Sequence, residues 1–468
     1  MTPAGVRAPA ASATGRSDGL VGVERALVVG FARTGRAVAR VLRARGVALV
    51  ALDDAPSPAA VAEADRLGVI LIATPETGRV AGLVGDVDLV VASPGVTPAH
   101  PALRAAPPDR LVSEVELAWR LCPVPIVAVT GTNGKTTVTA LVAAMLARSG
   151  RRAPAAGNIG RPLIEAVLEP GIDAVVAEVS SFQLAQTHDF RPGVATYLNF
   201  APDHLDWHGD VASYAAAKAR LFRRQRADDR AVANAEDPVT LAVAQAGQAR
   251  LWTFGRGGDY RRVGDSLVGP DGAELARIAD LRRSLPHDVA NALAALATAL
   301  GAGADPAAAR AALGETPTPP HRVELVAEGG GVRWYDDSKA TTPAAVAAAL
   351  AGFERVVLLA GGRNKGLDLS VLRDAAEQGG RRRVRAVVAL GEATDAVAAA
   401  FAGYRVESAA SMAEAVACAA ALAEPGDVVL LSPGCASFDW YRSYEERGED
   451  FARLARACTG EGGPDAGT

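Results

Sequence analysis

The feature that most constrains this chain is a repeated alternation of short apolar runs with helix-like segments. The run ALVVG at 26–30 is followed by a glycine-containing turn, by a segment of helical spacing at 36–46, and by a second β-prone run at 47–54. The same order of strand, loop and helix returns at 125–137, and further strand-like runs follow beyond residue 354. Strands that alternate with helices form parallel sheets. The sequence therefore predicts an α/β protein.

The length and the pattern together predict three α/β domains. A chain of 468 residues is long enough for about three domains of ordinary size. The pattern restarts near Cys122, and the proline-rich stretch at 315–322 is typical of an interdomain hinge. The predicted segments are a disordered tail at 1–24, domains at 25–121, 122–318 and 319–457, and a second tail at 458–468.

Composition argues against several classes of protein. The chain has 49 basic and 53 acidic side chains, a net charge of −4, whereas nucleic-acid-binding domains are usually basic. It has no apolar run long enough to span a membrane, and its first residues lack the pattern of a secretion signal. The four cysteines show neither CxxC pairing nor a disulfide framework. We therefore expect a protein of the reducing cytoplasm.

A glycine-rich loop at 130–137, TGTNGKTT, carries the most chemical information. Backbone N–H groups of such a loop, and the N-terminal end of the helix that follows it, bind phosphate oxygens. Lys135 can reach the β- and γ-phosphates, and Thr136 offers its hydroxyl to Mg²⁺. Val129 replaces the first glycine of the strict phosphate-loop pattern, so the loop is a shortened variant. An ordinary turn with a surface lysine is the alternative, but the flanking strand and helix favour phosphate binding.

Three polar residues downstream of this loop are candidates for metal binding. Glu178 ends a buried-type strand, where a carboxylate can hold Mg²⁺ directly or through water. His204 follows another β-prone run and could be a ligand of a second metal ion. Lys218 lies in an expected helix. The alternatives are a solvated strand end, an ordinary loop histidine and a solvent-facing charge.

The first predicted domain has a nucleotide-binding pattern of its own. The loop GFARTG at 30–35 stands where a dinucleotide fingerprint would, and Asp53 ends the next strand at a spacing suited to a ribose contact. Ala32 replaces the middle glycine, which disfavours a nicotinamide or flavin enzyme and favours another nucleotide or a sugar diphosphate. Ser93 begins a second strand-end turn, which could hold phosphate or be a plain turn.

Together these segments resemble the Mur ligase family over roughly residues 25–457. The motifs that carry the resemblance are GTNGKTT, GNIGRP, EVSSFQL, NFAPDHLDWH, the helix with Lys218, HDVANALAA, PPHRVE, DDSKATTP, GGRNKG and LSPGCASFDWYRSYEERG. The resemblance implies an N-terminal Rossmann-like domain for a UDP-sugar and a central phosphate-loop ATPase-like domain. It also implies a C-terminal Rossmann-like domain for an amino acid and part of ATP.

The resemblance also implies residue roles. UDP-sugar contacts are expected from Arg33, Thr34, Asp53, Ser93 and Asn158. ATP contacts are expected from Gly131, Thr132, Asn133, Gly134, Lys135, Thr136, Thr137, Asn291, Arg322 and Asp337. Metal ligands are expected to be Thr136, Glu178, His204 and Lys218, the lysine as a carbamate. Catalytic roles are expected for Lys135, His204, Lys218 and Lys339. The D-glutamate pocket is expected to contain Thr341, Lys365, Ser437, Phe438 and Tyr444.

Two positions depart from the family pattern. Asp288 follows His287 where the family usually has asparagine, so no role is carried over to it. Tyr444 stands where phenylalanine is common, which keeps aromatic packing and adds a hydroxyl. The carbamate on Lys218 requires a neutral amine, which burial or nearby cations favour.

The resemblance implies a monomeric, cytoplasmic, ATP-dependent ligase that uses Mg²⁺, two ions of it. It would join D-glutamate to UDP-N-acetylmuramoyl-L-alanine through an acyl phosphate, in peptidoglycan precursor synthesis and hence in cell-wall growth, shape and division. The alternatives are a sibling ligase for another amino acid, a folylpolyglutamate synthase, and a non-catalytic nucleotide sensor. The tail motif CASFDWYRSYEERG and SPGV favour D-glutamate, and the intact Lys135, Glu178, His204 and Lys218 argue against a sensor.

Overall fold

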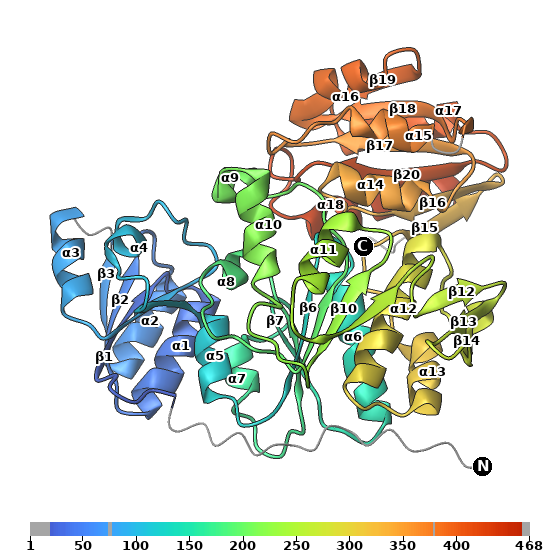
Figure 1. Cartoon of the computed structure of the whole chain (residues 1–468). Coiled ribbons are helices and arrows are strands. Elements are labelled where there is room, and N and C mark those ends of the chain that lie inside the picture. Colours follow the sequence, from blue (N-terminus) through green and yellow to red (C-terminus); the bar gives the residue numbers. More distant parts are fainter. Residues whose placement is uncertain (1–18, 74–76, 378–379, 461–468) are drawn as a thin grey trace, which may run out of the picture. The chain divides into compact units, whose positions relative to one another are not determined.

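The computed structural model describes residues 19–73, 77–377 and 380–460 (Figure 1). It contains three mainly parallel sheets and one small antiparallel sheet, with helices between the parallel strands. The predicted α/β class is confirmed. The described residues form two compact units. The first unit comprises residues 19–200, 207–282 and 290–316, and the second comprises 201–206, 283–289 and 317–460.

The first sheet of the first unit is parallel and has the order β3-β2-β1-β4-β5. Its strands are β1 Arg25–Val29, β2 Ala48–Asp53, β3 Ile70–Ala73, β4 Leu89–Ala92 and β5 Leu111–Ser113. The helices are α1 Arg33–Ala44, α2 Pro58–Leu67, α3 Thr77–Gly85, α4 Pro101–Ala105 and α5 Glu114–Leu121. The chain order reverses at β1, which lies between β2 and β4. A parallel sheet binds ligands beyond the carboxyl ends of its strands at such a point.

The second sheet is also parallel, with the order β11-β10-β9-β6-β8-β7. Its strands are β6 Ile126–Thr130, β7 Ala155–Gly157, β8 Val175–Glu178, β9 Val194–Tyr197, β10 Arg230–Asn234 and β11 Arg250–Phe254. The helices are α6 Lys135–Arg148, α7 Leu163–Ala166, α8 Ser181–Ala185, α9 Leu205–His208, α10 Val211–Ala219, α11 Pro238–Gln245, α12 Pro286–Gly301 and α13 Pro306–Glu315. All five residues of β6 are buried, as expected for a strand covered on both faces. The apolar segment at 292–299 of α12 is buried, as its sequence predicts.

A small antiparallel sheet in the same unit was not predicted. It consists of β12 Arg261–Val263, β13 Ser266–Val268 and β14 Glu274–Arg277, followed by the 3₁₀ turn η1 Ile278–Asp280. These strands have three or four residues each and show little apolar alternation, which is the signal that identifies a strand from sequence.

The sheet of the second unit has the order β15-β16-β20-β17-β18-β19. Its strands are β15 Glu324–Gly329, β16 Val332–Asp336, β17 Val356–Gly361, β18 Val384–Leu390, β19 Arg405–Ala409 and β20 Val428–Gly434. The helices are α14 Pro343–Leu350, α15 Val371–Ala376, η3 Gly391–Ala393, α16 Thr394–Ala400, α17 Met412–Leu422 and α18 Tyr444–Thr459. Only β15 is antiparallel, paired with β16 at the edge of the sheet. The three strands predicted beyond residue 354 are β17, β18 and β20.

The two predicted tails are only partly described. Residues 1–18 and 461–468 lie outside the described residues, but residues 19–24 form a turn in which Leu20 is buried. At the other end α18 continues to Thr459, two residues past the predicted end of the last domain. The first unit's last segment ends at residue 316, within the stretch predicted as a hinge. Within the described ranges, no helix is both long and apolar enough to cross a membrane. All four cysteines are free.

Gly35 allows α1 to pack closely on the end of β1. A Cβ atom at this position would lie 2.0 Å from the carbonyl oxygen of Gly30. We expect Gly35→Ala to lower the free energy of unfolding by about 1–3 kcal/mol, the usual cost of overpacking. Gly82→Ala is the matched control, because a Cβ there meets nothing within 4 Å in the interior of α3. Urea unfolding of both variants measures the difference, and equal stabilities would contradict the packing argument.

Candidate active site

The carboxyl ends of β1, β2 and β4 hold the first candidate site. The Asp53 carboxylate accepts hydrogen bonds from the backbone N–H of Phe31 at 2.6 Å and of Ala55 at 3.0 Å. The Ser93 hydroxyl donates to the Gly30 carbonyl at 2.7 Å. These contacts tie the loop after β1 to the ends of the two flanking strands. Arg33 and Thr34 open α1 directly after this loop, so the structure brings four of the five predicted UDP-sugar residues to one edge of the sheet.

The phosphate loop joins β6 to α6. Gly134 has φ 83° and caps α6, whose first residue is Lys135. The Lys135 ammonium donates to the carbonyl oxygens of Gly131 at 2.9 Å and of Thr132 at 3.0 Å. Asn199 fixes the turn from β9, since its side chain accepts from the Asn133 N–H at 2.8 Å and donates to the Asn133 carbonyl at 3.1 Å. The loop therefore presents the N-terminal end of a 14-residue helix, which favours anions.

Asn291 of α12 packs directly on the loop. A Cβ atom on Gly134 would lie 2.6 Å from its side-chain oxygen. The predicted ATP residue Asn291 is therefore beside the phosphate loop and leaves no room for a side chain at position 134, whose positive φ also favours glycine.

Glu178 lies next to the start of the phosphate loop, because it pairs in register with Val129 on the neighbouring strand. Its side chain is 2% exposed. One carboxylate oxygen accepts from the Asn158 amide at 2.7 Å, and the other has no hydrogen-bond partner among the described residues. A buried carboxylate oxygen without a donor is costly in a protein interior and suits a cation. The site therefore fits Mg²⁺.

Lys218 is buried beside the same loop, with 1% of its surface exposed. Its ammonium donates to the Gly131 carbonyl at 2.8 Å, the oxygen that Lys135 also contacts. It also lies 4.9 Å from the centre of the Tyr214 ring, whose hydroxyl is 3.2 Å from the Thr132 hydroxyl. The solvent-facing alternative for Lys218 is therefore wrong, and the helix places this lysine at the phosphate loop.

His204 belongs to the second unit, so the predicted metal ligands are divided between the two units. It has φ 55°, an uncommon value for a residue other than glycine. Asp203 holds it there by accepting from its backbone N–H at 2.8 Å and lying 3.2 Å from its Nε2. The same carboxylate lies 3.9 Å from the Lys365 ammonium. Asp203 therefore joins the segment at 201–206 to the loop after β17, both in the second unit.

Lys339 and Tyr444 meet in the second unit. The Lys339 ammonium donates to the Tyr444 hydroxyl at 2.7 Å and lies 4.6 Å from the centre of its ring. The Ser338 hydroxyl donates to the Tyr444 carbonyl at 2.8 Å. The catalytic lysine predicted from sequence and the predicted pocket tyrosine are thus in direct contact.

Arg447 is a buried residue that bridges two loops. It stands in one of the quoted family motifs, but no role is predicted for it from the sequence. Its guanidinium donates to the hydroxyl and the carbonyl of Ser338 and to the carbonyl of Cys435. Burial lowers its pKa to about 10, so the group is cationic at neutral pH. Arg447 therefore joins the loop that carries Lys339 to the loop that follows β20.

The loops after β17 and β20 are tied together. The backbone of Arg363 pairs with that of Ala436, and a Cβ on Gly362 would lie 2.4 Å from the Ala436 carbonyl oxygen. This pairing brings the Lys365 loop beside Ser437, which is buried, and Phe438, which is 60% exposed. Thr341 lies two residues after Lys339, to whose carbonyl its backbone N–H donates.

Asp288 has a clear structural partner. Its two carboxylate oxygens accept from the Arg283 guanidinium at 2.7 Å each, and Arg283 also donates to the carbonyls of Arg322 and Val323. The pair fixes the backbone around the predicted phosphate-contacting Arg322, where Val323 has φ 47°. The burial of the neighbouring His287 lowers its pKa, so its neutral form is favoured.

Asp337 is buried at the end of β16, next to β20. It accepts a hydrogen bond from the Ser432 hydroxyl at 2.7 Å. Burial raises its pKa to about 7, although Ser432 and Arg322 oppose this shift. The adjacent Asp336 lies 2.6 Å from Nδ1 of His321, and this contact raises the pKa of the histidine.

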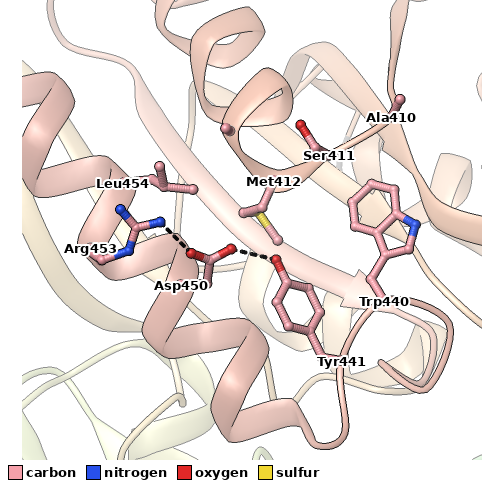
Figure 2. Close-up of a pocket in the computed structure, with 9 residues that line it drawn as sticks. Ala410, Ser411, Met412, Trp440, Tyr441, Asp450, Arg453 and Leu454 are labelled. Carbon is pink, nitrogen blue, oxygen red and sulfur yellow. Dashed lines mark hydrogen bonds and ion pairs between the residues drawn. The ribbon is translucent and has the colours of Figure 1, made fainter.

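A hollow of about 330 Å³ in the second unit lies between α17 and α18 (Figure 2). None of the predicted site residues lines it. Three of its polar side chains satisfy one another, since Asp450 accepts from the Tyr441 hydroxyl and pairs with Arg453. We assign no ligand to it.

The predicted ligand roles stay predictions, but the structure gathers the residues into two groups. No role is predicted from the sequence for Asn199, Asp203 and Arg447. The first two stand in the quoted segment NFAPDHLDWH, so their place in a polar strand-end loop was their only signal.

A phosphate loop at the switch point of a parallel sheet, with a buried carboxylate and two lysines around it, defines the class of phosphate-loop nucleotide-binding α/β proteins. Family models match three segments, described as Mur ligase MurD-like N-terminal domain at 24–110, Mur ligase middle domain at 129–299 and Mur ligase glutamate ligase domain at 321–435. The chain belongs to the Mur ligase family, as its motifs predict.

Relatives of known name match almost the whole chain. A UDP-N-acetylmuramoylalanine--D-glutamate ligase from Frankia casuarinae is 45% identical, over 93% of this chain and 94% of its own. A protein of the same name from Anaeromyxobacter dehalogenans is 46% identical, over 92% and 97%. Among solved structures, UDP-N-acetylmuramate-alanine ligase MurC from Thermotoga maritima has a TM-score of 0.57 at 20% identity, covering 92% of this chain and 99% of that one. That likeness supports the fold.

The raised pKa of Asp337 makes stability depend on pH. Its folded pKa of about 7 exceeds the ordinary value of about 4, so its contribution to stability is full below about pH 4 and is lost as the pH rises to 7. Asp337→Asn cannot ionise. We expect its free energy of unfolding to fall less than that of the wild type between about pH 4 and pH 8. Urea unfolding without nucleotide tests this, with the exposed Asp395→Asn as control; parallel curves for Asp337→Asn and wild type would refute the shift.

Proposed function

We propose that this chain is an ATP-dependent ligase that joins D-glutamate to UDP-N-acetylmuramoyl-L-alanine in peptidoglycan precursor synthesis. The observation that carries the proposal is the group of Lys135, Lys218 and Glu178 around the phosphate loop, the last two of them buried, in a chain 45–46% identical over nearly its full length to ligases of that name. A nucleotide sensor would not need to keep a buried lysine and a buried carboxylate beside the transferred phosphate.

The first step would transfer the γ-phosphoryl group. An oxygen of the L-alanyl carboxylate attacks the γ-phosphorus, the bond to the ADP oxygen breaks, and an acyl phosphate forms. The backbone N–H groups of the loop and the Lys135 ammonium offset the charge that develops on the phosphoryl oxygens. The ligands of two Mg²⁺ ions would be Glu178, the Thr136 hydroxyl, His204 and Lys218. Magnesium supplies further charge neutralisation at the transferred group.

The second step would form the amide. The uncharged amine of D-glutamate attacks the acyl carbon, the bond to the phosphate oxygen breaks, and inorganic phosphate leaves after the amine has lost a proton. Because water would hydrolyse an acyl phosphate, the reaction requires a site that excludes water. The Lys339 ammonium, oriented by the Tyr444 hydroxyl, is suited to offset charge on the leaving phosphate.

Lys218 would act as a carbamate. The ammonium groups of Lys135 and Lys218 both donate to the Gly131 carbonyl oxygen, at 2.9 Å and 2.8 Å. Two like charges that share one acceptor are close together and repel each other. The Lys218 ammonium first loses a proton, and the neutral amine then adds CO₂ and loses a second proton, so that an anion replaces a cation. That change relieves the repulsion from Lys135 and supplies an oxygen ligand of the kind that Mg²⁺ prefers.

The D-glutamate pocket would lie in the second unit. Lys365, Thr341 and Ser437 offer an ammonium and two hydroxyls for two carboxylates, while Phe438 and Tyr444 flank the methylene stem. The pairing of the loops after β17 and β20 supports this assignment, because it holds Lys365 and Ser437 on neighbouring loops. The nucleotide substrates are those of the cytoplasm, where we place the enzyme, and we propose that it acts as a monomer.

The amino acid acceptor tests the proposal directly. With ATP and UDP-N-acetylmuramoyl-L-alanine, we expect phosphate release with D-glutamate and little with L-glutamate, L-alanine or diaminopimelate. Inverting the α-centre moves the amine away from the acyl carbon, and a misplacement of about 1 Å can cost roughly a hundredfold in rate. Within this panel, Lys365→Ala should raise the KM for D-glutamate and leave that for ATP nearly unchanged.

Arg363→Ala is the matched control for Lys365→Ala, since Arg363 stands two residues away and its side chain pairs with Glu392 at the surface. Preference for L-alanine or diaminopimelate would favour a sibling ligase. An effect of Lys365→Ala on the KM for ATP alone would reject the pocket assignment while leaving the reaction intact.

The carbamate predicts chemical rescue. Lys218→Ala should lose at least about a hundredfold in kcat, because a charge-stabilising group at a phosphoryl-transfer site is worth several kcal/mol. Acetate or formate should restore part of the activity, since a free carboxylate can occupy the vacated space. Lys218→Arg keeps a cation that cannot be carbamylated, and it should be inactive with or without acetate. Normal activity of the alanine variant would show that the lysine has no such role.

A further inference from the structure

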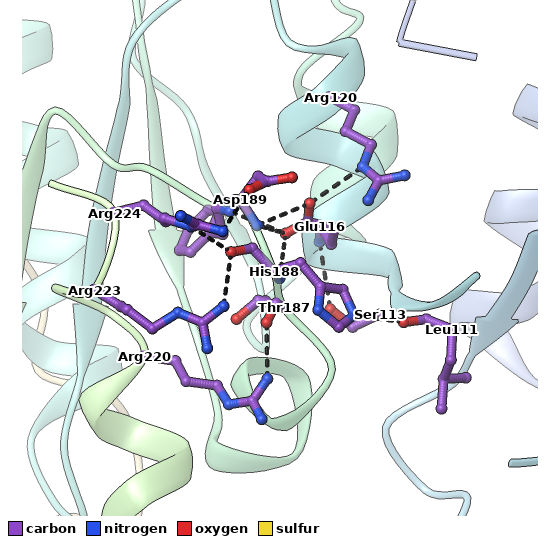
Figure 3. A network of polar contacts seen from close by, with 11 residues as sticks. Leu111, Ser113, Glu116, Arg120, Thr187, His188, Asp189, Arg220, Arg223 and Arg224 are labelled. Carbon is purple, nitrogen blue, oxygen red and sulfur yellow. Dashed lines mark hydrogen bonds and ion pairs between the residues drawn. The ribbon is translucent and has the colours of Figure 1, made fainter. Parts of the chain in front are cut away.

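The loop at 186–190 is the first part of the connection from α8 to β9 and has no part in the reaction described above. It contains Gln186, Thr187, His188, Asp189 and Phe190. Figure 3 shows that polar side chains approach it from two elements that are far apart in the sequence, α5 and the end of α10. An ordinary surface loop does not form so many hydrogen bonds to side chains of other elements. These contacts indicate that the loop has a structural role, which its own sequence does not show.

On one side the loop binds Glu116 of α5. This carboxylate is fully buried and accepts hydrogen bonds from three consecutive backbone N–H groups, those of His188 at 3.0 Å, Asp189 at 3.2 Å and Phe190 at 2.9 Å. It also accepts from the Arg120 guanidinium at 3.1 Å. Hydrogen bonds to a charged acceptor are stronger than neutral ones, and successive N–H groups form an anion-binding concavity.

The strand before α5 adds two contacts to the same loop. The Ser113 N–H donates to the Gln186 carbonyl at 2.8 Å, and Nε2 of His188 lies 2.8 Å from the Leu111 carbonyl oxygen. Leu111 and Ser113 are the first and last residues of β5, in the sheet that carries the UDP-sugar residues. The loop is therefore fixed to the first sheet at several points, with Glu116 at the centre (Figure 3).

On its other side the loop is held by arginines that follow Lys218. The Arg220 guanidinium donates to the Thr187 carbonyl at 2.8 Å. The guanidinium groups of Arg223 and Arg224 both donate to the His188 carbonyl, at 3.1 Å and 2.9 Å. Arg220 is only two residues from Lys218, so the loop fixes the end of α10 at the point where this helix delivers Lys218 to the Gly131 carbonyl.

We infer that Glu116 is a positioning residue for Lys218. It orders the backbone of the 186–190 loop, and the carbonyls of that loop anchor the end of α10 through Arg220, Arg223 and Arg224. These contacts connect the sheet that contains β5 with Lys218 at the phosphate loop. Movement of α10 relative to the phosphate loop would change the distance from Lys218 to Gly131, while the ATP-binding loop itself stays intact.

Hydrogen–deuterium exchange tests the link without any assumption about the reaction. In Glu116→Gln and Glu116→Ala, measured on the full chain without substrates, we expect faster exchange in the 186–190 loop and also in α10. The matched control is Asp88→Asn, because the Asp88 carboxylate likewise accepts two backbone N–H groups, at 2.9 Å each, but at the start of β1. The control should leave exchange in α10 unchanged. Faster exchange confined to the loop, or none, would overturn the inference.

Kinetics provide the second readout, which rests on the proposed ligase function. We expect Glu116→Gln to lower kcat by at least about tenfold, because a misplacement of 1 Å can cost roughly a hundredfold. The KM for ATP should stay near that of the wild type. If Glu116 acts through α10, its effect on kcat should not add to that of Arg220→Met, whereas it should add to that of Asp88→Asn.

The outcomes separate the two proposals. An inactive wild-type chain would reject the ligase function, and the exchange experiment would still decide the link to α10. An active wild type with unchanged kcat in Glu116→Gln would overturn the positioning role, as would effects of Glu116→Gln and Arg220→Met that simply add. If Glu116→Ala fails to fold, Glu116→Gln decides alone, since it keeps one acceptor oxygen for the loop.

Discussion

The site depends on one short connection, the phosphate loop between β6 and α6. Because β6 lies between β8 and β9 in the sheet, the loop meets Glu178 from one neighbour and Asn199 from the other. Its Gly131 carbonyl receives both Lys135 and Lys218. Glu178 and Asn199 are therefore placed by the ends of strands that flank β6, whereas Lys218 is delivered by α10. The chemistry follows from this convergence, since it concentrates positive charge where phosphate would bind.

Sequence reasoning could find the parts of the site that are local. The apolar run of β6, the glycines and the lysine of the loop stand within 12 residues, so the strand, the turn and the helix start are visible together. Glu178 and Asp53 were found for a similar reason, because each ends an apolar run and the carboxyl ends of parallel strands share an edge. The same rule identified the strand-end turn at Ser93, and the structure brings its hydroxyl to the Gly30 carbonyl. At each of these positions the local sequence identifies the strand, and the order of strands in the sheet determines which residues lie beside its end.

Residues that act across the chain could not be found in this way. Arg447 contacts Ser338, which is 109 residues away, and Glu116 contacts loop residues 72–74 positions away. A buried charge in a helix has the same sequence appearance as an exposed one, and only the fold shows which it is. The short strands β12–β14 were not predicted for another reason. Three or four residues are too few to show the alternation of apolar and polar side chains that identifies a strand. His204 could be named but its positive φ could not, because Asp203 and the tertiary structure impose it.

The proposed D-glutamate site of the second unit holds its cations in contacts with other side chains. Lys339 donates to the Tyr444 hydroxyl at 2.7 Å, a hydrogen bond that the phenylalanine common at this position in the family could not accept. Lys365 lies 3.9 Å from Asp203, too far for a hydrogen bond but close enough for attraction. The Lys365 ammonium has three donors, so its contact with Asp203 does not prevent it from binding a carboxylate. The negative charge of Asp203 also weakens the attraction between Lys365 and a single anion. The proposed pocket would therefore bind best an amino acid whose carboxylates contact several donors at once. A dicarboxylate amino acid meets that requirement and alanine does not.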